Sequence, residues 1–317
     1  MKFEEMRIID LSAGNPGTGL FILKQKELRK AQSGKLFINL DFCDKTGTIN
    51  SKIWDATQET YDSLLINKVY YVKGRVDLYN GTLQFTVDKY KPAEQEIQDQ
   101  IEQYVPAAPE KPEDMLEYIE NCVEGFENVD LKLLVQYFIE ANREKLLFYP
   151  AAKSLHHAVR SGLLYHIKRM LMTAEGLVNV YEGINKDLLF AGVILHDMDK
   201  LNELEANSLG MADYTTEGQL LGHITMGVLT LQKLCDDLSV NPEITLMLQH
   251  MILSHHGIAE YGSPKPPMIL EAEVLHHLDL LDARIYDYND TLQNIEPGEF
   301  SEPVWSMDKR RIYKHKI

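Results

Sequence analysis

The residues best suited to chemistry are His196 and Asp197, which stand side by side at the end of an apolar run over 188–195. Such a run predicts a buried element, so an imidazole and a carboxylate are offered to one point where that element ends. This pair suits a divalent metal ion, and the carboxylate can also bridge to a second ion. Lys200, three residues after Asp197, could reach a phosphate as a point charge. The stretch therefore predicts a metal site beside a phosphate-binding lysine.

Histidines are concentrated in one part of the chain, and most of them stand in apolar helical surroundings. A single histidine on an apolar face is commonly a hydrogen-bonded core residue, but many repeated cases are hard to explain in that way. Each buried polar group costs a few kcal/mol unless a partner satisfies it, and metal ions would satisfy most of these groups at once. Ten of the eleven histidines lie between residues 156 and 277: His156, His157, His166, His196, His223, His250, His255, His256, His276 and His277.

Length and composition are those of a globular protein. The 317 residues suffice for about two domains, with 44% hydrophobic and 25% charged residues. The first residues contain no apolar signal region, and no apolar run approaches the roughly 18 residues that a membrane span needs. Cys43, Cys122 and Cys235 are far apart and are interpreted as free thiols. We therefore expect a cytoplasmic protein without a membrane partner.

The charge is unevenly distributed along the chain. A net charge of −16 by itself argues against nucleic acid as a partner. Residues 1–90, however, hold 13 basic and 11 acidic side chains, a net of +2, whereas residues 91–130 hold 2 basic and 12 acidic ones, a net of −10. The last residues of the chain are basic again. Nucleic acid therefore remains a candidate partner of the N-terminal part, although solvated surface explains its basic groups equally well.

The first ninety residues predict a barrel of five strands. Apolar alternation and turn signals place strands at 20–23, 36–42, 48–54, 68–79 and 82–90, with a helix at 57–65 between the third and the fourth. Asn80-Gly81 is a strong hairpin turn signal. This order of elements is that of an OB-fold barrel, which binds oligonucleotides by stacking bases on exposed aromatic residues within a basic groove.

Aromatic and basic residues of this barrel are the candidates for contacts with nucleic acid. Most aromatic residues of a barrel simply fill its core, so each aromatic candidate has that alternative role. The candidates are Phe21, Lys24, Lys26, Lys35, Trp54 and Tyr79, with Phe37, Phe85, Arg29 and Lys30 as further members of the same two sets.

A helical domain is expected after an acidic linker. Residues 91–112 are proline-flanked and acidic, which is typical of a linker. From residue 113 onward apolar residues recur with helical spacing, and the two stripes over 115–123 and 131–139 are best explained as core. We therefore expect a barrel domain over 1–90, a linker over 91–112 and an all-α domain over 113–317 that ends in a basic tail.

The order of these histidines and aspartates resembles that of the HD-domain metal-dependent phosphohydrolases, an all-helical superfamily. The resemblance implies one ion held by His166, His196, Asp197 and Asp279, and a second ion held by His223, His255 and His256, with Asp197 bridging the two. Asp279 is preferred over Asp282 because it holds the family's position just ahead of a second acid and an alanine; Asp282 and His276 are rivals or supporting partners. Many two-metal members carry glycine before the lysine, where this chain has Asp199, which we expect at the mouth of the site.

The whole layout is similar to that of the YhaM-type 3′-5′ exoribonucleases, in which an OB-fold precedes an HD domain. The resemblance runs from Phe21 to the C-terminus and includes Asp44-Lys45-Thr46-Gly47 and Ile53-Trp54-Asp55 in the barrel. In the helical part it includes the histidine pair at 156–157, the segment 162–166, and Ser254-His255-His256-Gly257 followed by 260–264, a sequence that differs from that of the cyclic-dinucleotide enzymes. It implies release of nucleotides from the 3′ ends of single-stranded RNA, with some activity on single-stranded DNA.

The reaction that this resemblance implies needs two divalent ions, Mn²⁺ first, with Fe²⁺, Co²⁺ and Mg²⁺ as alternatives. A pair of ions would clamp the scissile phosphate for in-line attack. Lys200 would neutralise phosphate charge, and His157 or His276 would contact the leaving oxygen. Two other functions stay open at this point: an HD-domain phosphodiesterase for nucleotides or cyclic dinucleotides, and a non-catalytic OB-fold RNA-binding protein. The sequence does not give the oligomeric state.

Overall fold

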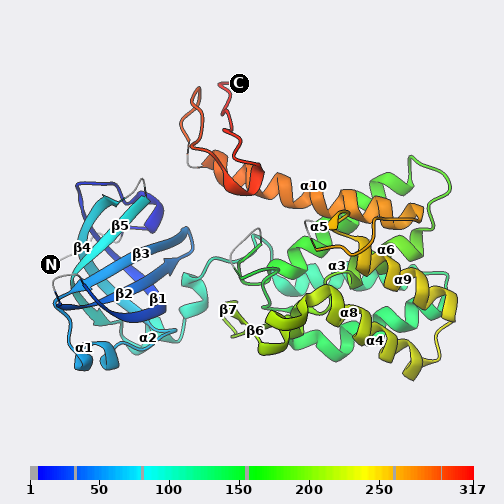
Figure 1. Cartoon of the computed structure of the whole chain (residues 1–317), viewed down its shortest axis with the longest axis horizontal. Helices are drawn as coiled ribbons and strands as arrows, with labels where there is room; N and C mark the ends of the chain where they lie inside the picture. Colours follow the sequence, from blue (N-terminus) through cyan, green and yellow to red (C-terminus); the bar gives the residue numbers. More distant parts are fainter. Residues whose placement is uncertain (1–5, 32–33, 80–81, 154–156, 260–261, 294) are drawn as a thin grey trace. The chain divides into compact units, whose positions relative to one another are not determined.

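The protein consists of two compact units. The structure, a computed structural model, describes residues 6–31, 34–79, 82–153, 157–259, 262–293 and 295–317. The chain divides into the units Met1–Ala107 and Ala108–Ile317, a strand-built barrel and a mainly helical unit (Figure 1). The division falls inside the segment 91–112, in which a linker was expected.

The first unit is a closed five-stranded barrel. Its strands follow the order β1-β2-β3-β5-β4, in which β3 and β5 are parallel and all other neighbours antiparallel. A single helix, α1, lies between β3 and β4, so the predicted OB-fold is confirmed; the expected turn at Asn80-Gly81 lies outside the described residues. The elements are η1 (Ile8–Asp10), β1 (Pro16–Lys30), β2 (Leu36–Asp44), β3 (Gly47–Trp54), α1 (Gln58–Ser63), β4 (Val69–Tyr79), β5 (Thr82–Pro92), α2 (Gln95–Gln98) and η2 (Ile101–Tyr104).

The segment after β5 is tied to the barrel. Gln98 of α2 forms two hydrogen bonds with the backbone of Val69 in β4: its Oε1 accepts from the amide at 3.0 Å and its Nε2 donates to the carbonyl at 2.8 Å. The first part of the acidic segment therefore extends the barrel unit, and the second unit begins shortly before α3.

The barrel interior contains one residue that was expected to bind RNA. Phe21 is fully buried, and its ring centroid lies 6.3 Å from that of Phe42 and 6.2 Å from that of Phe85. A ring enclosed on all sides cannot stack on a base, so the prediction of an RNA contact is wrong for Phe21, and Phe85 is core as well. In a closed barrel, alternation shows which residues share a face but not which face is the inside.

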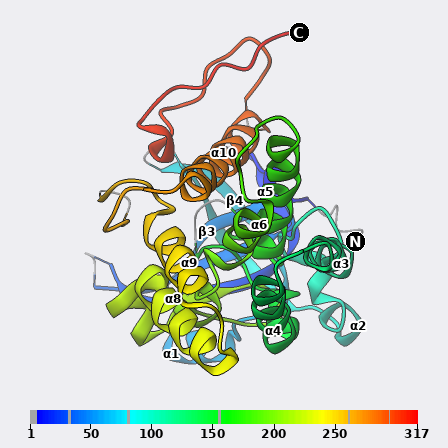
Figure 2. The same cartoon turned by 90° about the vertical axis from the view of Figure 1, so that its right-hand side faces the viewer.

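The second unit is organised around one buried helix, α6. All residues of α6 from Leu189 to Leu195 are buried, and the helix contacts α3, α4, α5, α9 and α10 (Figure 2). The apolar run that precedes the His-Asp pair is therefore a core helix, as predicted. The elements are α3 (Pro112–Glu124), α4 (Val129–Leu146), α5 (Gly162–Val178), α6 (Lys186–Leu195), α7 (Lys200–Glu203), β6 (Leu204–Ala206), β7 (Ala212–Tyr214), α8 (Thr216–Leu238), α9 (Pro242–Ser254), α10 (Leu270–Gln293) and η4 (Trp305–Met307).

This helical unit is the predicted all-α domain with one addition, the small antiparallel hairpin of β6 and β7, which the sequence did not reveal. The two stripes expected to be core, in α3 and α4, are buried. Among the helices that the described residues form, none has the length and apolar character required to cross a membrane.

Candidate metal centre

The C-terminal end of α6 presents the His-Asp pair in the interior of the helical unit. His196 is the residue that caps α6, and its Nδ1 donates a hydrogen bond to the carbonyl oxygen of Val193 at 2.8 Å. The carbonyl can only accept, so the proton is fixed on Nδ1 and the lone pair of Nε2 is free to bind a metal. Nε2 lies 3.4 Å from Oδ2 of Asp197, and both residues are buried.

Helices α5 and α10 bring a second histidine and two aspartates to the same place. Nε2 of His166 lies 3.4 Å from Oδ1 of Asp279, and Nδ1 of His166 lies 2.9 Å from Oδ2 of Asp282. Asp279 therefore lies beside Nε2, the nitrogen that faces the metal centre, whereas Asp282 contacts Nδ1 on the opposite side of the ring. On sequence grounds Asp279 is preferred as the ligand, with Asp282 as a rival or supporting partner, and the two aspartates contact different nitrogens of His166.

Helices α8 and α9 contribute three more histidines. The ligand atoms of His223, His255 and His256 all lie within 4.8 Å of one another, as do those of His166, His196 and Asp197. Oδ1 of Asp197 lies 3.3 Å from Nε2 of His223 and 3.8 Å from Nε2 of His255. Asp197 thus adjoins both groups with its two oxygens, one toward each.

Several buried polar atoms converge on this centre without a hydrogen-bond partner among the described residues: Nε2 of His196, Nε2 of His223, Nε2 of His255 and Oδ1 of Asp197. Leaving one such atom unsatisfied costs about 1–3 kcal/mol, so four of them in one place require a common partner. A divalent ion coordinates imidazole nitrogen and carboxylate oxygen directly. The residues present therefore fit a divalent metal.

The charges around the centre prepare its side chains for metal binding. Burial raises the pKa of Asp197, but the charge of Lys200 and the adjoining imidazole of His196 outweigh burial and hold that pKa well below its usual range. Nζ of Lys200 lies 2.9 Å from Oδ2 of Asp197. Burial lowers the pKa of His255 and His256, which keeps their imidazoles neutral, as metal ligands must be.

His166 has the opposite tendency. Burial by itself would lower the pKa of His166, but the hydrogen bonds to Asp279 and Asp282 raise it to about 9. An ion that binds Nε2 of His166 must therefore displace a proton at neutral pH. Metal binding to the group that contains His166 therefore requires loss of a proton, whereas His255 and His256 in the other group are already neutral.

The structure corrects the expected role of His157. Its side chain is fully buried, and Nε2 lies 2.8 Å from Oδ2 of Asp282, the same oxygen that faces His166. Oδ1 of Asp282 forms an ion pair with Arg169, whose Nε lies 2.8 Å away. Both oxygens of the Asp282 carboxylate are therefore engaged by side chains of the protein. A histidine enclosed behind it cannot contact a leaving oxygen, so that prediction is wrong for His157.

His276, the other candidate for the leaving oxygen, supports the backbone of the ligand segment. Its Nδ1 donates to the carbonyl oxygen of His255 at 2.8 Å. Gly257 has a φ of +79° and leaves no room for a side chain, since a Cβ there would lie 2.4 Å from the His276 ring. The glycine after the histidine pair is thus required for close approach of α10 to the end of α9.

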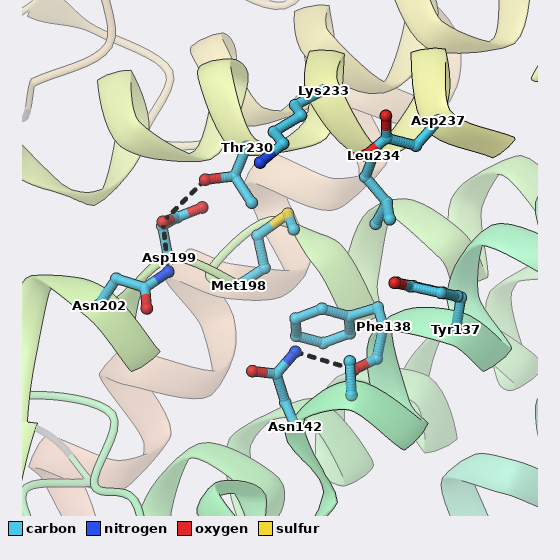
Figure 3. Close-up of a pocket in the computed structure, with 11 residues that line it drawn as sticks. Tyr137, Phe138, Asn142, Met198, Asp199, Asn202, Thr230, Lys233, Leu234 and Asp237 are labelled. Carbon is cyan, nitrogen blue, oxygen red and sulfur yellow. Dashed lines mark hydrogen bonds between the residues drawn. The ribbon is translucent and has the colours of Figure 1, made fainter. Parts of the chain in front are cut away.

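Asp199, expected at the mouth of the site, instead lies behind it. Its side chain is buried, with 1% of the residue exposed, and Oδ1 accepts from Asn202 at 2.9 Å and from Thr230 at 3.1 Å. Figure 3 shows these two bonds at the edge of a cavity of about 250 Å³ between α4 and α8, where Met198 and Lys233 also lie. Asp199 therefore joins α7 to α8 by hydrogen bonds and is enclosed, not exposed at an opening.

Two supporting residues were missed by sequence reasoning, Arg169 and Glu203. Oε1 of Glu203 accepts from the backbone amide of His223 at 3.0 Å and lies 3.2 Å from its Nδ1. Burial raises the pKa of Glu203, but the hydrogen bonds from His223 outweigh burial and lower it. No spacing in the sequence links Glu203 to His223, because the two meet only where α7 packs against α8. Arg169 lies three residues after His166, a helical spacing that could have identified it.

On the barrel, two of the predicted aromatic residues do form an exposed surface. Trp54 is 47% and Tyr79 59% exposed. The ring of Phe37 in β2 lies 5.0 Å from that of Trp54, and Nζ of Lys52 lies 5.3 Å from the Trp54 ring and 5.2 Å from the Tyr79 ring. We call Phe37, Lys52, Trp54 and Tyr79 the aromatic surface of the barrel. Lys52 was not foreseen.

The predicted lysines interact with other groups of the barrel or are half-buried. Nζ of Lys26 donates to the carbonyl oxygen of Tyr61 at 2.6 Å and lies 4.1 Å from that residue's ring. Lys35 pairs with Asp55 at 2.8 Å, and Lys24 is half-buried in β1. Strand β1 ends at Lys30, so Lys35 lies outside it. Within the strand, alternation places Lys26 and Lys30 on one face and Arg29 on the other, so the basic residues do not all share one face.

Both domains match known families. Residues 23–93 match the family of OB-fold nucleic acid binding domains, and residues 163–284 match the HD domain family. The latter family implies binding of divalent metal, in agreement with the clustered histidines and aspartates. The second OB-fold domain of replication protein A from Methanococcus maripaludis is 20% identical to this chain, covers 28% of it and 95% of its own length, and has a TM-score of 0.24.

Two curated relatives extend the similarity to nearly the full length. The 3′-5′ exoribonuclease YhaM of Geobacillus sp. (strain WCH70) is 38% identical over 97% of this chain and 94% of the relative. The protein of the same name from Oceanobacillus iheyensis is 37% identical over 95% of this chain and 94% of the relative. From this similarity, together with a barrel and a helical metal centre in the same order, it follows that the chain belongs to the YhaM family of 3′-5′ exoribonucleases.

Proposed function

We propose that this protein is a metal-dependent 3′-5′ exoribonuclease that removes nucleotides from single-stranded RNA. The observation that carries the proposal is the convergence of four unsatisfied buried ligand atoms around Asp197 in the HD domain. The direction of digestion and the RNA substrate follow from family membership. The three cysteines are free thiols, which supports a reducing compartment and hence the cytoplasm.

The proposal includes two divalent ions with Mn²⁺ as the preferred metal. One ion would be held by His166, His196, Asp197 and Asp279, and the other by Asp197, His223, His255 and His256. Imidazoles mixed with carboxylates suit Mn²⁺ and Fe²⁺ better than Mg²⁺, which prefers oxygen ligands alone. Bound ions supply charge stabilisation at the scissile phosphate and a water nucleophile at neutral pH.

Residues of the chain itself set up this chemistry. The carbonyl of Val193 and the carboxylate of Asp282 fix the imidazoles of His196 and His166 from behind, so these side chains need no reorganisation when they bind. Lys200 holds its ammonium group beside Asp197. We assign to Lys200 the contact with a phosphate oxygen of the RNA, because a rigidly held cation at that place offsets the charge of the substrate.

The barrel is proposed to hold the RNA strand through its aromatic surface. Base stacking on aromatic side chains contributes about 1–3 kcal/mol per base and tolerates any sequence. The exposed rings of Trp54 and Tyr79, with the cation of Lys52 near both, offer this combination. Since stacking does not read the 2′-hydroxyl, single-stranded DNA should bind to the same surface.

The test uses single-stranded RNA labelled at its 5′ end, incubated with the full chain and Mn²⁺, with chelator in a parallel reaction. A ladder of labelled products that shorten from the 3′ end only in the presence of metal is the expected result. Hydrolysis of small nucleotides without RNA shortening would favour the phosphodiesterase alternative, and RNA binding without hydrolysis would favour a non-catalytic role.

A further inference from the structure

The histidines that face the metal centre are held from behind in two different ways. His196 and His255 cap α6 and α9, and Nδ1 of each donates to the carbonyl three residues earlier, Val193 at 2.8 Å and Ile252 at 2.7 Å. Their own helices therefore orient these two rings. Nδ1 of His223 instead faces a carboxylate from another element, Oε1 of Glu203, at 3.2 Å.

The reason lies in the backbone of α8. Gly222 has φ 70° and ψ 156°, which are not helical values, so α8 is kinked directly before His223. A positive φ of this kind favours glycine. Across the kink, the preceding turn cannot offer its carbonyl to Nδ1 of His223 as it does for the other two histidines. The kink also leaves the amide of His223 without an intrahelical partner, as at any helix start.

Glu203 resolves both consequences of the kink with one oxygen. Its Oε1 accepts from the amide of His223 at 3.0 Å as well as facing Nδ1. The side chain thus caps the second part of α8 and orients the ring at the same time. A carboxylate beside Nδ1 fixes the proton on that nitrogen, so Nε2 is the atom left for a metal, and it points to Asp197 at 3.3 Å.

The position of Glu203 is itself fixed. Its carbonyl accepts from the amide of Thr215 at 2.9 Å and from the hydroxyl of the same residue at 3.2 Å. Gly218 lies so close that a Cβ on it would be 2.2 Å from that carbonyl oxygen. The residue is buried, with 9% exposed. Glu203 is therefore held against the first turn of α8 by its backbone, independently of His223.

We infer that Glu203 is a positioning residue for His223, and that it sets the affinity of the ion bound by His223, His255 and His256 without setting that of the other ion. This inference rests on the two-ion form of the proposed function. The other ligand group has its own supports, Asp282 behind His166 and Val193 behind His196. Loss of such a supporting partner commonly weakens metal binding by about 10- to 100-fold.

The experiment is a calorimetric titration of the full chain, freed of metal, with Mn²⁺. We expect two binding events in the unaltered protein. In Glu203→Ala one of them should weaken by about 10- to 100-fold while the other stays within a few-fold. Glu203→Gln keeps an oxygen that can accept both hydrogen bonds but lacks the charge, so its loss should be intermediate. Glu205→Ala, an exposed glutamate two residues along the chain, is the matched control and should bind both ions normally.

Three other results would bear on the role of Glu203. If Glu203→Ala binds both ions as the unaltered protein does, or loses both equally, Glu203 does not position one ligand group and the inference is wrong. If thermal melting shows that Glu203→Ala does not fold, Glu203→Gln decides by the same criterion. If the unaltered protein itself binds a single Mn²⁺, the two-ion proposal fails and the inference fails with it, a result that no Glu203 variant could produce.

Discussion

At the scale of single residues, the metal centre is a set of imidazoles whose protons are already assigned. His196 and His255 donate through Nδ1 to carbonyls of their own helices, and His166 faces Asp282 through Nδ1. In each case Nε2 is the nitrogen that remains for a metal. The two carboxylates differ: both oxygens of Asp282 are engaged by side chains of the protein, whereas Oδ1 of Asp197 has no hydrogen-bond partner among the described residues.

The protonation of His166 predicts a pH dependence of metal binding. Its pKa is raised to about 9, so the metal-free side chain is protonated below that pH and an ion must displace the proton. The pKa values of His255 and His256 are lowered, so binding there releases no proton. The Mn²⁺ affinity of one ion should therefore rise about tenfold per pH unit from about pH 6 toward pH 9, while that of the other changes little.

This dependence can be measured by titrating Mn²⁺ at several pH values in buffers of different ionisation enthalpy, which reports the protons released. The unaltered protein should release about one proton at neutral pH. An affinity for both ions that is flat over this range would contradict the assignment of His166 as a ligand.

At the scale of elements, the barrel separates two aromatic roles that its sequence does not distinguish. Phe21 points into the core of the barrel and Trp54 to its surface, although both stand in alternating strands. Phe21→Ala should destabilise the protein by about 3–5 kcal/mol, as loss of a buried aromatic ring commonly does. At temperatures where the variant's barrel is folded, its RNA affinity should equal that of the unaltered protein.

Trp54→Ala should show the reverse pattern. Its ring is 47% exposed, so stability should change by no more than about 0.5 kcal/mol, while RNA binding should weaken by about 1–3 kcal/mol. Chemical denaturation and fluorescence anisotropy with labelled RNA measure the two quantities. Unchanged RNA affinity in Trp54→Ala would show that the aromatic surface does not hold the strand.

The elements that the sequence predicted well are those with a strong periodic pattern. The five strands and α1 follow from alternation and turn residues, and the buried α6 follows from an uninterrupted apolar run. What could not be predicted depends on how elements meet. Glu203 reaches His223 only because α8 kinks at Gly222, and Asp199 and His157 are enclosed only because neighbouring helices cover them. Contacts of this kind cannot be predicted from the spacing of residues along the chain.

At the scale of the whole molecule, each unit has its own hydrophobic core. Residues 108–317 alone should therefore fold and still hydrolyse a small phosphodiester such as bis-p-nitrophenyl phosphate when Mn²⁺ is present. Their affinity for a long single-stranded RNA should fall, since the aromatic surface is removed. Binding of that RNA as tightly as by the full chain would contradict the role given to the barrel.

The charge of the whole chain predicts a weak salt dependence of RNA binding. With a net charge of −16, long-range attraction is poor, and Arg29, Lys35 and Arg75 of the barrel already pair with acidic side chains. Two to four phosphate contacts on a single strand would give a log–log salt slope of roughly −1.4 to −2.8. Anisotropy titrations at increasing salt measure this slope, and a much steeper value would show a larger basic surface than the one described.

The central claim is that Asp197 joins two metal-binding groups into one hydrolytic centre, and the metal content of Asp197→Ala tests it most directly. Measured by elemental analysis after loading with Mn²⁺ and removal of free metal, the unaltered chain should hold two ions, and the variant should hold close to none. Circular dichroism should show that the variant keeps its helices, and digestion of RNA should stop. An unchanged number of bound ions in Asp197→Ala would contradict the account.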